Sequence, residues 1–160
     1  MKIVTAAFVV VTGLLMVPPA FAQLAMPADT KAITDCLEKA DSGEQLGIGN
    51  NCIGIVADPC VEKSDKMSAR TKVCATRELA VWTALTEAAS KRVKAGGFKD
   101  IIAAVTESNK GWMQLRDKLC PAFDKIEPGF LPADGTYCRM QVTAHRALLL
   151  RRLGDAVNEH

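Results

Sequence analysis

The sequence has few of the side chains on which enzymes, metal proteins and nucleic-acid-binding proteins commonly depend. Of its 160 residues only two are histidine, aromatic residues make up 5%, and 20 basic residues face 18 acidic ones. A chain so close to neutral lacks the concentrated basic face that neutralises nucleic-acid phosphates. Its 49% hydrophobic content nevertheless excludes global disorder. We therefore expect a folded protein without a nucleic-acid partner.

Motifs of common enzyme classes are also missing. The chain has no G-x-S-x-G, no H-E-x-x-H and no glycine-rich phosphate loop after a strand. A catalytic triad would need His145, but its neighbours Arg146, Arg151 and Arg152 indicate a solvated basic helix face, where cations offset the helix dipole. We predict that the protein is not an enzyme and needs no cofactor.

The first 22 residues have the composition of an export signal. Lys2 gives a basic start, residues 3–17 are mainly apolar, and Ala20-Phe21-Ala22 provides small residues before a cleavage site. A membrane anchor is the alternative, but it needs about 20 apolar residues. We predict cleavage after Ala22, no stable membrane insertion and a periplasmic or secreted product. Residues 23–160 suit a single domain.

All six cysteines follow this signal, and an even number in an exported protein predicts three disulfides. The smallest gap between cysteines, from Cys52 to Cys60, is wider than the close pairs of a zinc site. A cysteine held in a disulfide is also not a nucleophile. We therefore predict no metal site and no catalytic thiol.

Apolar residues repeat every three or four positions in four segments, which predicts helices and no strands. The expected helices run from Asp29 or Thr30 to Gly43, from Ser68 to Ala95, from Lys99 to Cys120 and from Thr136 to Val157. The apolar stripes contain Ala75, Leu79, Trp82, Leu85, Ala89 and Val93 in the second helix, Ile101, Val105, Ser108, Trp112, Leu115 and Leu119 in the third, and Met140, Thr143, Ala144, Ala147 and Leu150 in the fourth, widened by Leu148, Leu149 and Leu153. Such stripes, with Trp82 and Trp112 on them, are typical of a core. Segments 46–64 and 121–135 are rich in glycine, asparagine or proline and are expected to be loops. We predict an all-α fold, a small antiparallel bundle of about four helices.

The expected helices rank the possible disulfides. Cys120 ends one helix and Cys138 opens the next, so a bridge between them closes the proline-rich loop. Cys36 and Cys74 lie on or beside the apolar stripes of the first two helices. The favoured set is Cys120–Cys138, Cys36–Cys74 and Cys52–Cys60; the alternative keeps the first pair and joins Cys36 with Cys52 and Cys60 with Cys74.

The most specific string is a W-x-x-x-R-D-x-x-C pattern formed by Trp112, Arg116, Asp117 and Cys120. Positions four apart share one side of a helix, so the ring, the guanidinium and the cysteine lie in a row. An arginine can stack on tryptophan while its fork binds a carboxylate. We expect a structural clamp in which Arg116 pairs with an acid such as Glu78 or Asp117. A ligand-contacting arginine is the alternative.

With these motifs the chain resembles the family of LprI-like lysozyme inhibitor N-terminal domains. That family has a Q-x-x-W-x-x-x-R-D-x-x-C block, a later cysteine and a T-x-x-R-x-x-x-L ending. The matching residues are Asn109, Trp112, Arg116, Asp117, Cys120, Cys138, Thr143, Arg146 and Leu150, and the helix with Arg77-Glu78 and Trp82, together with Cys36 and Cys74, resembles the first half. The resemblance covers about residues 34–153. Asn109 departs from the usual glutamine, and Thr86-Glu87-x-x-Ser90 stands in place of L-N-x-x-Y.

The resemblance implies a small, exported, disulfide-bonded bacterial domain whose motif residues are structural, and some relatives are associated with lysozyme inhibition. We expect a non-catalytic envelope protein that binds and inhibits a lysozyme-type muramidase. The candidate contact loop lies between two cysteines and contains Phe123, Phe130 and Tyr137; a preformed loop loses little entropy on docking. One alternative is a periplasmic structural or assembly domain that binds another envelope protein. Another is a small-molecule carrier, which needs a deep apolar pocket.

The cysteine assignment predicts that the protein isolated without reductant has no free thiol. A thiol-reactive dye added under denaturing conditions should label no site before reduction and all six cysteines after it. Labelling of several thiols before reduction would contradict both the disulfide and the export predictions.

Overall fold

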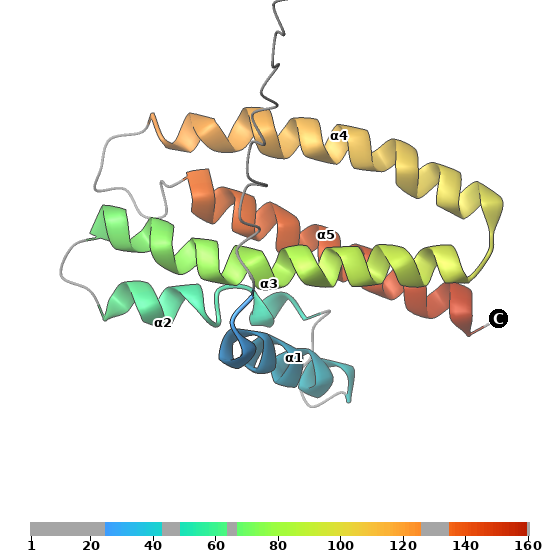
Figure 1. Cartoon of the computed structure of the whole chain (residues 1–160), viewed down its shortest axis with the longest axis horizontal. Coiled ribbons are helices and arrows are strands. Elements are labelled where there is room, and N and C mark those ends of the chain that lie inside the picture. The colour runs from blue at the N-terminus through green and yellow to red at the C-terminus, as the bar shows by residue number, and fades with distance from the viewer. Residues whose placement is uncertain (1–24, 43–48, 64–66, 126–134, 160) are drawn as a thin grey trace, which may run out of the picture.

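A computed structural model of the chain describes residues 25–42, 49–63, 67–125 and 135–159 (Figure 1). The expected signal peptide and Phe130 lie outside these ranges. Within them the chain forms α1 (Pro27–Asp41), the 3-10 turn η1 (Asn50–Cys52), α2 (Ala57–Glu62), α3 (Met67–Ala95), α4 (Lys99–Phe123) and α5 (Gly135–Asn158). The predicted all-α class is confirmed for this part of the chain. The predicted number of about four helices is not, because α2 is a fifth.

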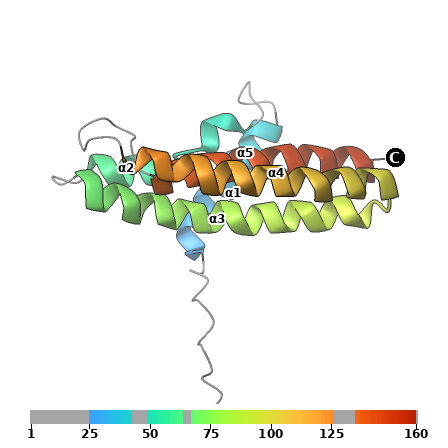
Figure 2. The same cartoon turned by 90° about the horizontal axis from the view of Figure 1, so that it is seen from above.

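Helices α3 and α5 lie side by side and form the centre of the molecule (Figure 1). Helix α4 runs along the other side of α5, while α1, η1 and α2 pack on α3 from the side away from α4. Figure 2 shows the same three long helices from above, nearly aligned. One side of the molecule is therefore formed by α4, and the opposite side is formed by α1 and α2 (Figure 1).

The predicted apolar stripes of α3 and α5 form the core. Trp82 of α3 and Met140 of α5 are fully buried, and both belong to one cluster with Ile33 and Leu37 of α1. The other buried members of the two predicted stripes are Ala75, Ala89, Val93, Thr143, Ala144, Ala147 and Leu150. Leu79, Leu85 and Leu153 are partly buried, whereas Leu149, which the prediction adds to the α5 stripe, is 57% exposed. Periodicity thus identified the buried face of each central helix but made that of α5 too wide.

The predicted stripe of α4 is only partly buried. Trp112 is half-buried, whereas Leu115 is 53% exposed and Leu119 is 49% exposed. Helix α4 packs mainly on α5 and has few contacts with α3, so one flank of its apolar surface has no neighbour among the described residues. The expectation that this whole stripe is core is wrong.

Two helix boundaries differ from the prediction. Helix α1 begins at Pro27, where the fixed proline φ suits a first helical position and no hydrogen bond is lost. Asp29, one of the two expected N-caps, instead accepts two hydrogen bonds from Arg77, at 3.0 and 2.7 Å. Helix α4 continues through Pro121 to Phe123. Asp124 then accepts a 2.8 Å hydrogen bond from the Gly135 N–H, which joins the two ends of the following segment.

The structure contains the expected Cys120–Cys138 disulfide but contradicts the other two favoured pairs. It joins Cys36 to Cys52 and Cys60 to Cys74, which is the alternative set. The reason is that the segment read as a loop contains η1 and α2. Turn η1 places Cys52 against α1, and α2 turns Cys60 toward α3, so these two sulfurs do not face each other.

A buried carboxylate joins this segment to the core. Glu78 of α3 is fully buried and accepts hydrogen bonds from the backbone N–H groups of Gly54, Val56 and Ala57, at 2.7, 3.0 and 2.8 Å. It also accepts one from Trp82 Nε1 at 2.8 Å. Val56 and Ala57 begin α2, where backbone N–H groups have no partner within the helix and a negative charge is favourable. Glu78 therefore binds α2 to α3. It does not pair with Arg116, of which it was one expected partner.

Gly54 lets the backbone turn toward this carboxylate. Its φ is +95°, in the left-handed region that favours glycine. A Cβ at this position would also meet the carboxyl group of Asp58, an exposed side chain that would have to move. The glycine is thus favoured chiefly by the backbone conformation of the turn.

Replacing Glu78 should therefore have a large effect on stability. We expect Glu78→Ala to lower the free energy of unfolding by about 3–5 kcal/mol, because it leaves buried N–H donors without an acceptor. Urea unfolding followed by circular dichroism measures the change. The matched control is Glu87→Ala, an exposed position on the same helix, which should stay within about 0.5 kcal/mol of wild type. Equal losses in the two variants would contradict the role of Glu78.

Candidate functional site

The W-x-x-x-R-D-x-x-C motif forms a contact within α4. The guanidinium carbon of Arg116 lies 4.8 Å from the centre of the Trp112 ring. Its Nε and a terminal nitrogen donate to the Asp117 carboxylate at 2.7 and 3.2 Å, and this pairing holds the pKa of Asp117 below its ordinary value. Asp117, one of the two expected partners, is thus the acid of the clamp. Because all three residues belong to one helix and the carboxylate is exposed, the clamp does not fix α4 against another helix and contributes little to stability.

Trp112 and a second motif residue, Arg146, attach α4 to α5. Trp112 Nε1 donates to the Val142 carbonyl at 3.3 Å. Arg146 donates to the Val105 carbonyl at 3.3 Å and to the Ser108 hydroxyl at 2.9 Å. These polar contacts supplement the limited apolar packing of α4.

Arg146 does not lie on a solvated basic face, as the sequence had suggested. It is 8% exposed, and this burial lowers the pKa of its guanidinium. In the described part of the chain its Nε and the hydroxyl of Thr143 have no hydrogen-bond partner. His145 and Arg152 are exposed, and Arg151 is paired with Asp41. The T-x-x-R ending therefore lies inside the bundle, as expected of structural residues.

One flank of α4 presents an uncharged surface to solvent. Its residues follow one another at intervals of three or four, so they share one side of the helix. They are Ala104, Ser108, Gly111, Leu115, Leu119 and Ala122, and all six are exposed; Ser108, which also accepts the Arg146 hydrogen bond, marks the edge of this surface toward α5. We call this surface the α4 apolar face. Exposed leucines next to each other mark contact surfaces more often than isolated ones do, and Leu119 adjoins the Cys120–Cys138 bridge.

The candidate contact loop is less exposed at its ends than the sequence suggested. Phe123 is half-buried at the end of α4, and Phe130 lies outside the described residues. Tyr137 is half-buried in α5, and its hydroxyl donates to Asp58 of α2 at 2.7 Å. Burial, and then the bond to this carboxylate, raise the pKa of the Tyr137 phenol. Tyr137 is thus held by the fold and is not a displayed loop residue.

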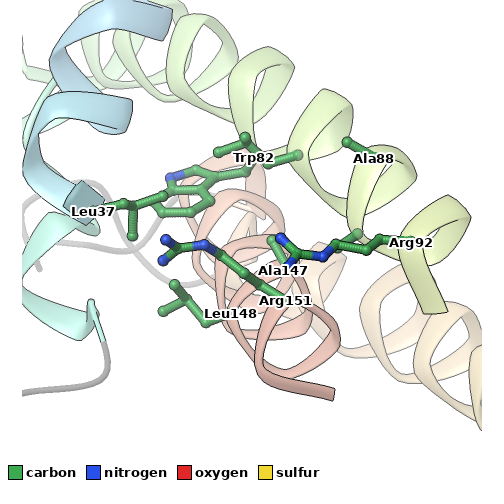
Figure 3. A pocket seen from close by; sticks show the side chains of 9 residues that line it. Leu37, Trp82, Ala88, Arg92, Ala147, Leu148 and Arg151 are labelled. Carbon is green, nitrogen blue, oxygen red and sulfur yellow. The ribbon is translucent and has the colours of Figure 1, made fainter. Parts of the chain in front are cut away.

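A cavity of about 190 Å³ lies between α1, α3 and α5 (Figure 3). Leu37, Trp82, Ala147 and Leu148 give it apolar walls. An apolar cavity of about 150 Å³ is large enough for benzene, whereas pockets for drug-sized ligands have volumes of about 300–1,000 Å³. This cavity therefore suits only a small apolar group.

Two arginines lie at the edge of this cavity. Figure 3 shows Arg151 reaching between Leu148 and Trp82, with Arg92 beside it. Each arginine forms a salt bridge with a different carboxylate. Arg92 pairs with Asp155 at 2.9 Å, and Arg151 pairs with Asp41. The edge of the cavity is therefore close to neutral and gives no preference for a charged ligand.

The sequence predicted neither the exposure of the α4 apolar face nor the cavity between α1, α3 and α5. Three residues of the α4 apolar face, Ser108, Leu115 and Leu119, belong to the stripe predicted as core, because periodicity cannot show whether a neighbouring helix is present. Gly111, a poor residue for a helix interior, was the available signal that this flank is unusual.

Among the described residues, no cluster of histidine, cysteine, aspartate or glutamate is arranged to ligate a metal ion. In the same part of the chain, no helix has the length and hydrophobicity to span a membrane.

No family model, curated protein or solved structure matches the chain. The resemblance to the LprI-like family thus depends on the motif residues alone and stays a prediction. The structure places these residues in α3, α4 and α5, apart from Cys36, which lies in α1. Their contacts join helices or stack within one helix, and they do not converge on a shared cavity.

The Tyr137–Asp58 contact predicts a change in the tyrosine titration. Tyr137 is the only tyrosine in the chain, so tyrosinate absorbance reports it alone. The folded protein should keep the phenol protonated above pH about 10, where an unfolded tyrosine ionises. Its contribution to stability is therefore present below that pH and lost as the pH rises through the folded-state pKa.

Absorbance titrations of native and urea-unfolded protein measure this difference. Asp58→Asn should move the native midpoint down toward that of the unfolded chain, because it removes the acceptor charge. The contact would be contradicted by native and unfolded protein titrating at the same pH.

Proposed function

We propose that the protein is an exported, non-catalytic domain of the LprI-like family that binds another protein through the α4 apolar face. The observation that carries this proposal is the unbroken uncharged flank from Ala104 to Ala122, with two leucines about half exposed. Burial of such side chains at an interface is favourable by roughly 25 cal/mol per Å² of apolar surface. The face is long enough for a helix or a loop of a partner.

Gly111 at the middle of this face supports the proposal. A glycine inside a helix costs about 1 kcal/mol relative to alanine. A Cβ added at Gly111 would meet nothing within 4 Å, so packing within the described chain does not require the glycine. A partner that approaches the α4 backbone closely would require it, since only glycine leaves that space open.

The disulfides support a rigid domain that works outside the cytoplasm. Three bridges join the described cysteines, and such bridges persist in oxidising compartments. The bridge at Cys120 fixes the end of α4 to the start of α5. A surface that is already ordered loses less entropy on binding. We place the protein in the periplasm or the secreted fraction.

We propose a lysozyme-type muramidase as the partner, on the basis of the motif resemblance. The alternative is an envelope protein with which the domain assembles without inhibiting an enzyme. The cavity beside Trp82 favours a different second function, carriage of a small apolar ligand. Its volume of about 190 Å³ admits only a group about as large as benzene, so we rank this function below protein binding.

A muramidase assay with three forms of the protein tests the proposal. Wild type should slow cell-wall cleavage at micromolar concentration, and Gly111→Arg should weaken this inhibition at least about tenfold because its side chain blocks close approach. The matched control is Thr106→Arg, which adds the same charge at an exposed position on the opposite side of α4. It should inhibit like wild type.

Stability measurements separate binding from folding in this test. Gly111→Arg should unfold at a slightly higher temperature, because arginine is the better helix former and a Cβ at this position meets nothing within 4 Å. Undiminished cleavage with wild type would remove the muramidase as the target. Loss of an envelope partner from Gly111→Arg pull-downs but not from Thr106→Arg pull-downs would then support assembly. Equal behaviour of the two variants in every assay would contradict the α4 apolar face.

A further inference from the structure

A second cavity lies on the side of the molecule away from α4. It has a volume of about 360 Å³ and is lined by residues of α1, α2 and α3 and by the Gly54–Val56 turn. Its charged lining residues are Asp29, Lys63, Arg70 and Arg77. This volume falls within the range of about 300–1,000 Å³ that is usual for small-ligand sites.

The Cys60–Cys74 disulfide brings the cations of this cavity together. Lys63 follows Cys60 by three positions, and Arg70 and Arg77 lie four before and three after Cys74. Residues three or four apart on a helix share one side, so Arg70 and Arg77 of α3 lie on the side of Cys74, and Lys63, the residue that follows α2, lines the same cavity as Cys60. The positions of the charges are therefore set by a covalent bond between the two helices.

The cavity has an excess of positive charge. Asp29 is the one acid among the described residues that line it, and Arg77 binds both of its oxygens. Asp29 is 5% exposed, so this pair holds Arg77 firmly against α1. Within the described part of the chain Lys63 and Arg70 form no salt bridge. Two positive charges beside a paired arginine thus face an open cavity.

We propose that this cavity binds a phosphate monoester. Lys63 and Arg70, which have no salt bridge among the described residues, match the charge of a dianionic phosphate, and an arginine fork can hold two of its oxygens. The cavity is larger than a phosphate alone, and Ile55 and Pro59 provide an apolar wall for the group that carries it. The source is either a soluble sugar or glycerol phosphate or the headgroup of a phosphorylated lipid. This site is separate from the α4 apolar face and does not depend on the proposed partner.

Calorimetric titration with glycerol 3-phosphate at constant ionic strength tests the site. Wild type should bind one equivalent, and Lys63→Ala/Arg70→Ala should bind at least about tenfold more weakly. The matched control is Lys91→Ala/Lys118→Ala, which removes the same charge at exposed positions of α3 and α4. Its affinity should equal that of wild type. Arg77 is left unchanged, because its replacement would leave the buried Asp29 carboxylate without its cation.

A second arm distinguishes the two sources. Flotation with neutral phosphatidylcholine vesicles, with and without phosphatidic acid, shows whether a lipid phosphate is bound. Binding of glycerol 3-phosphate without capture by vesicles supports a soluble ligand. Capture by vesicles that contain phosphatidic acid supports a lipid headgroup, and the Lys63→Ala/Arg70→Ala variant should then lose this capture. Melting temperatures in chloride, expected to be equal for all forms, verify folding, and the single variants replace the double one if it unfolds. No binding in either arm, or equal losses in the two double variants, would overturn the proposal.

Discussion

The buried carboxylate of Glu78 is the interaction on which the arrangement of the first half of the chain depends. One side chain accepts hydrogen bonds from Trp82, which lies at the centre of the core, and from three backbone groups where α2 begins. A carboxylate is stable in such a place only when its oxygens are fully hydrogen-bonded. The same contacts orient α2, so that Cys60 faces Cys74. The phosphate site that we propose lies around that disulfide.

The long helices are buried to very different extents. Helices α3 and α5 bury their apolar stripes against each other and α1, whereas α4 covers only one side of α5. Polar contacts of Trp112 and Arg146 and the Cys120–Cys138 bridge keep α4 in place without requiring that all its leucines be buried. The α4 apolar face can therefore remain available for a partner while the fold is maintained elsewhere.

Besides Glu78, the buried charges of Asp29 and Arg146 have different roles. Asp29 has a cation bound to both of its oxygens, so its burial orders α1 against α3 and positions Arg77. Arg146 has only a carbonyl and a hydroxyl as hydrogen-bond acceptors, so its burial opposes stability more than it supports it. The arginine nevertheless connects α4 to α5 at a specific register. Asp29 thus orders the side of the molecule where we propose the phosphate site, and Arg146 orders the side that carries the α4 apolar face.

The sequence by itself determined the helical class, the ranges of the three long helices, the core role of Trp82 and the Cys120–Cys138 bridge. Each follows from local periodicity or from cysteines on either side of one loop. Only the tertiary structure decided the other two disulfides, the partners of Glu78, the burial of Arg146 and the exposure of Leu115 and Leu119. These depend on which helix lies next to which, and the side-chain pattern of a single helix is the same whether its neighbour is another helix or water.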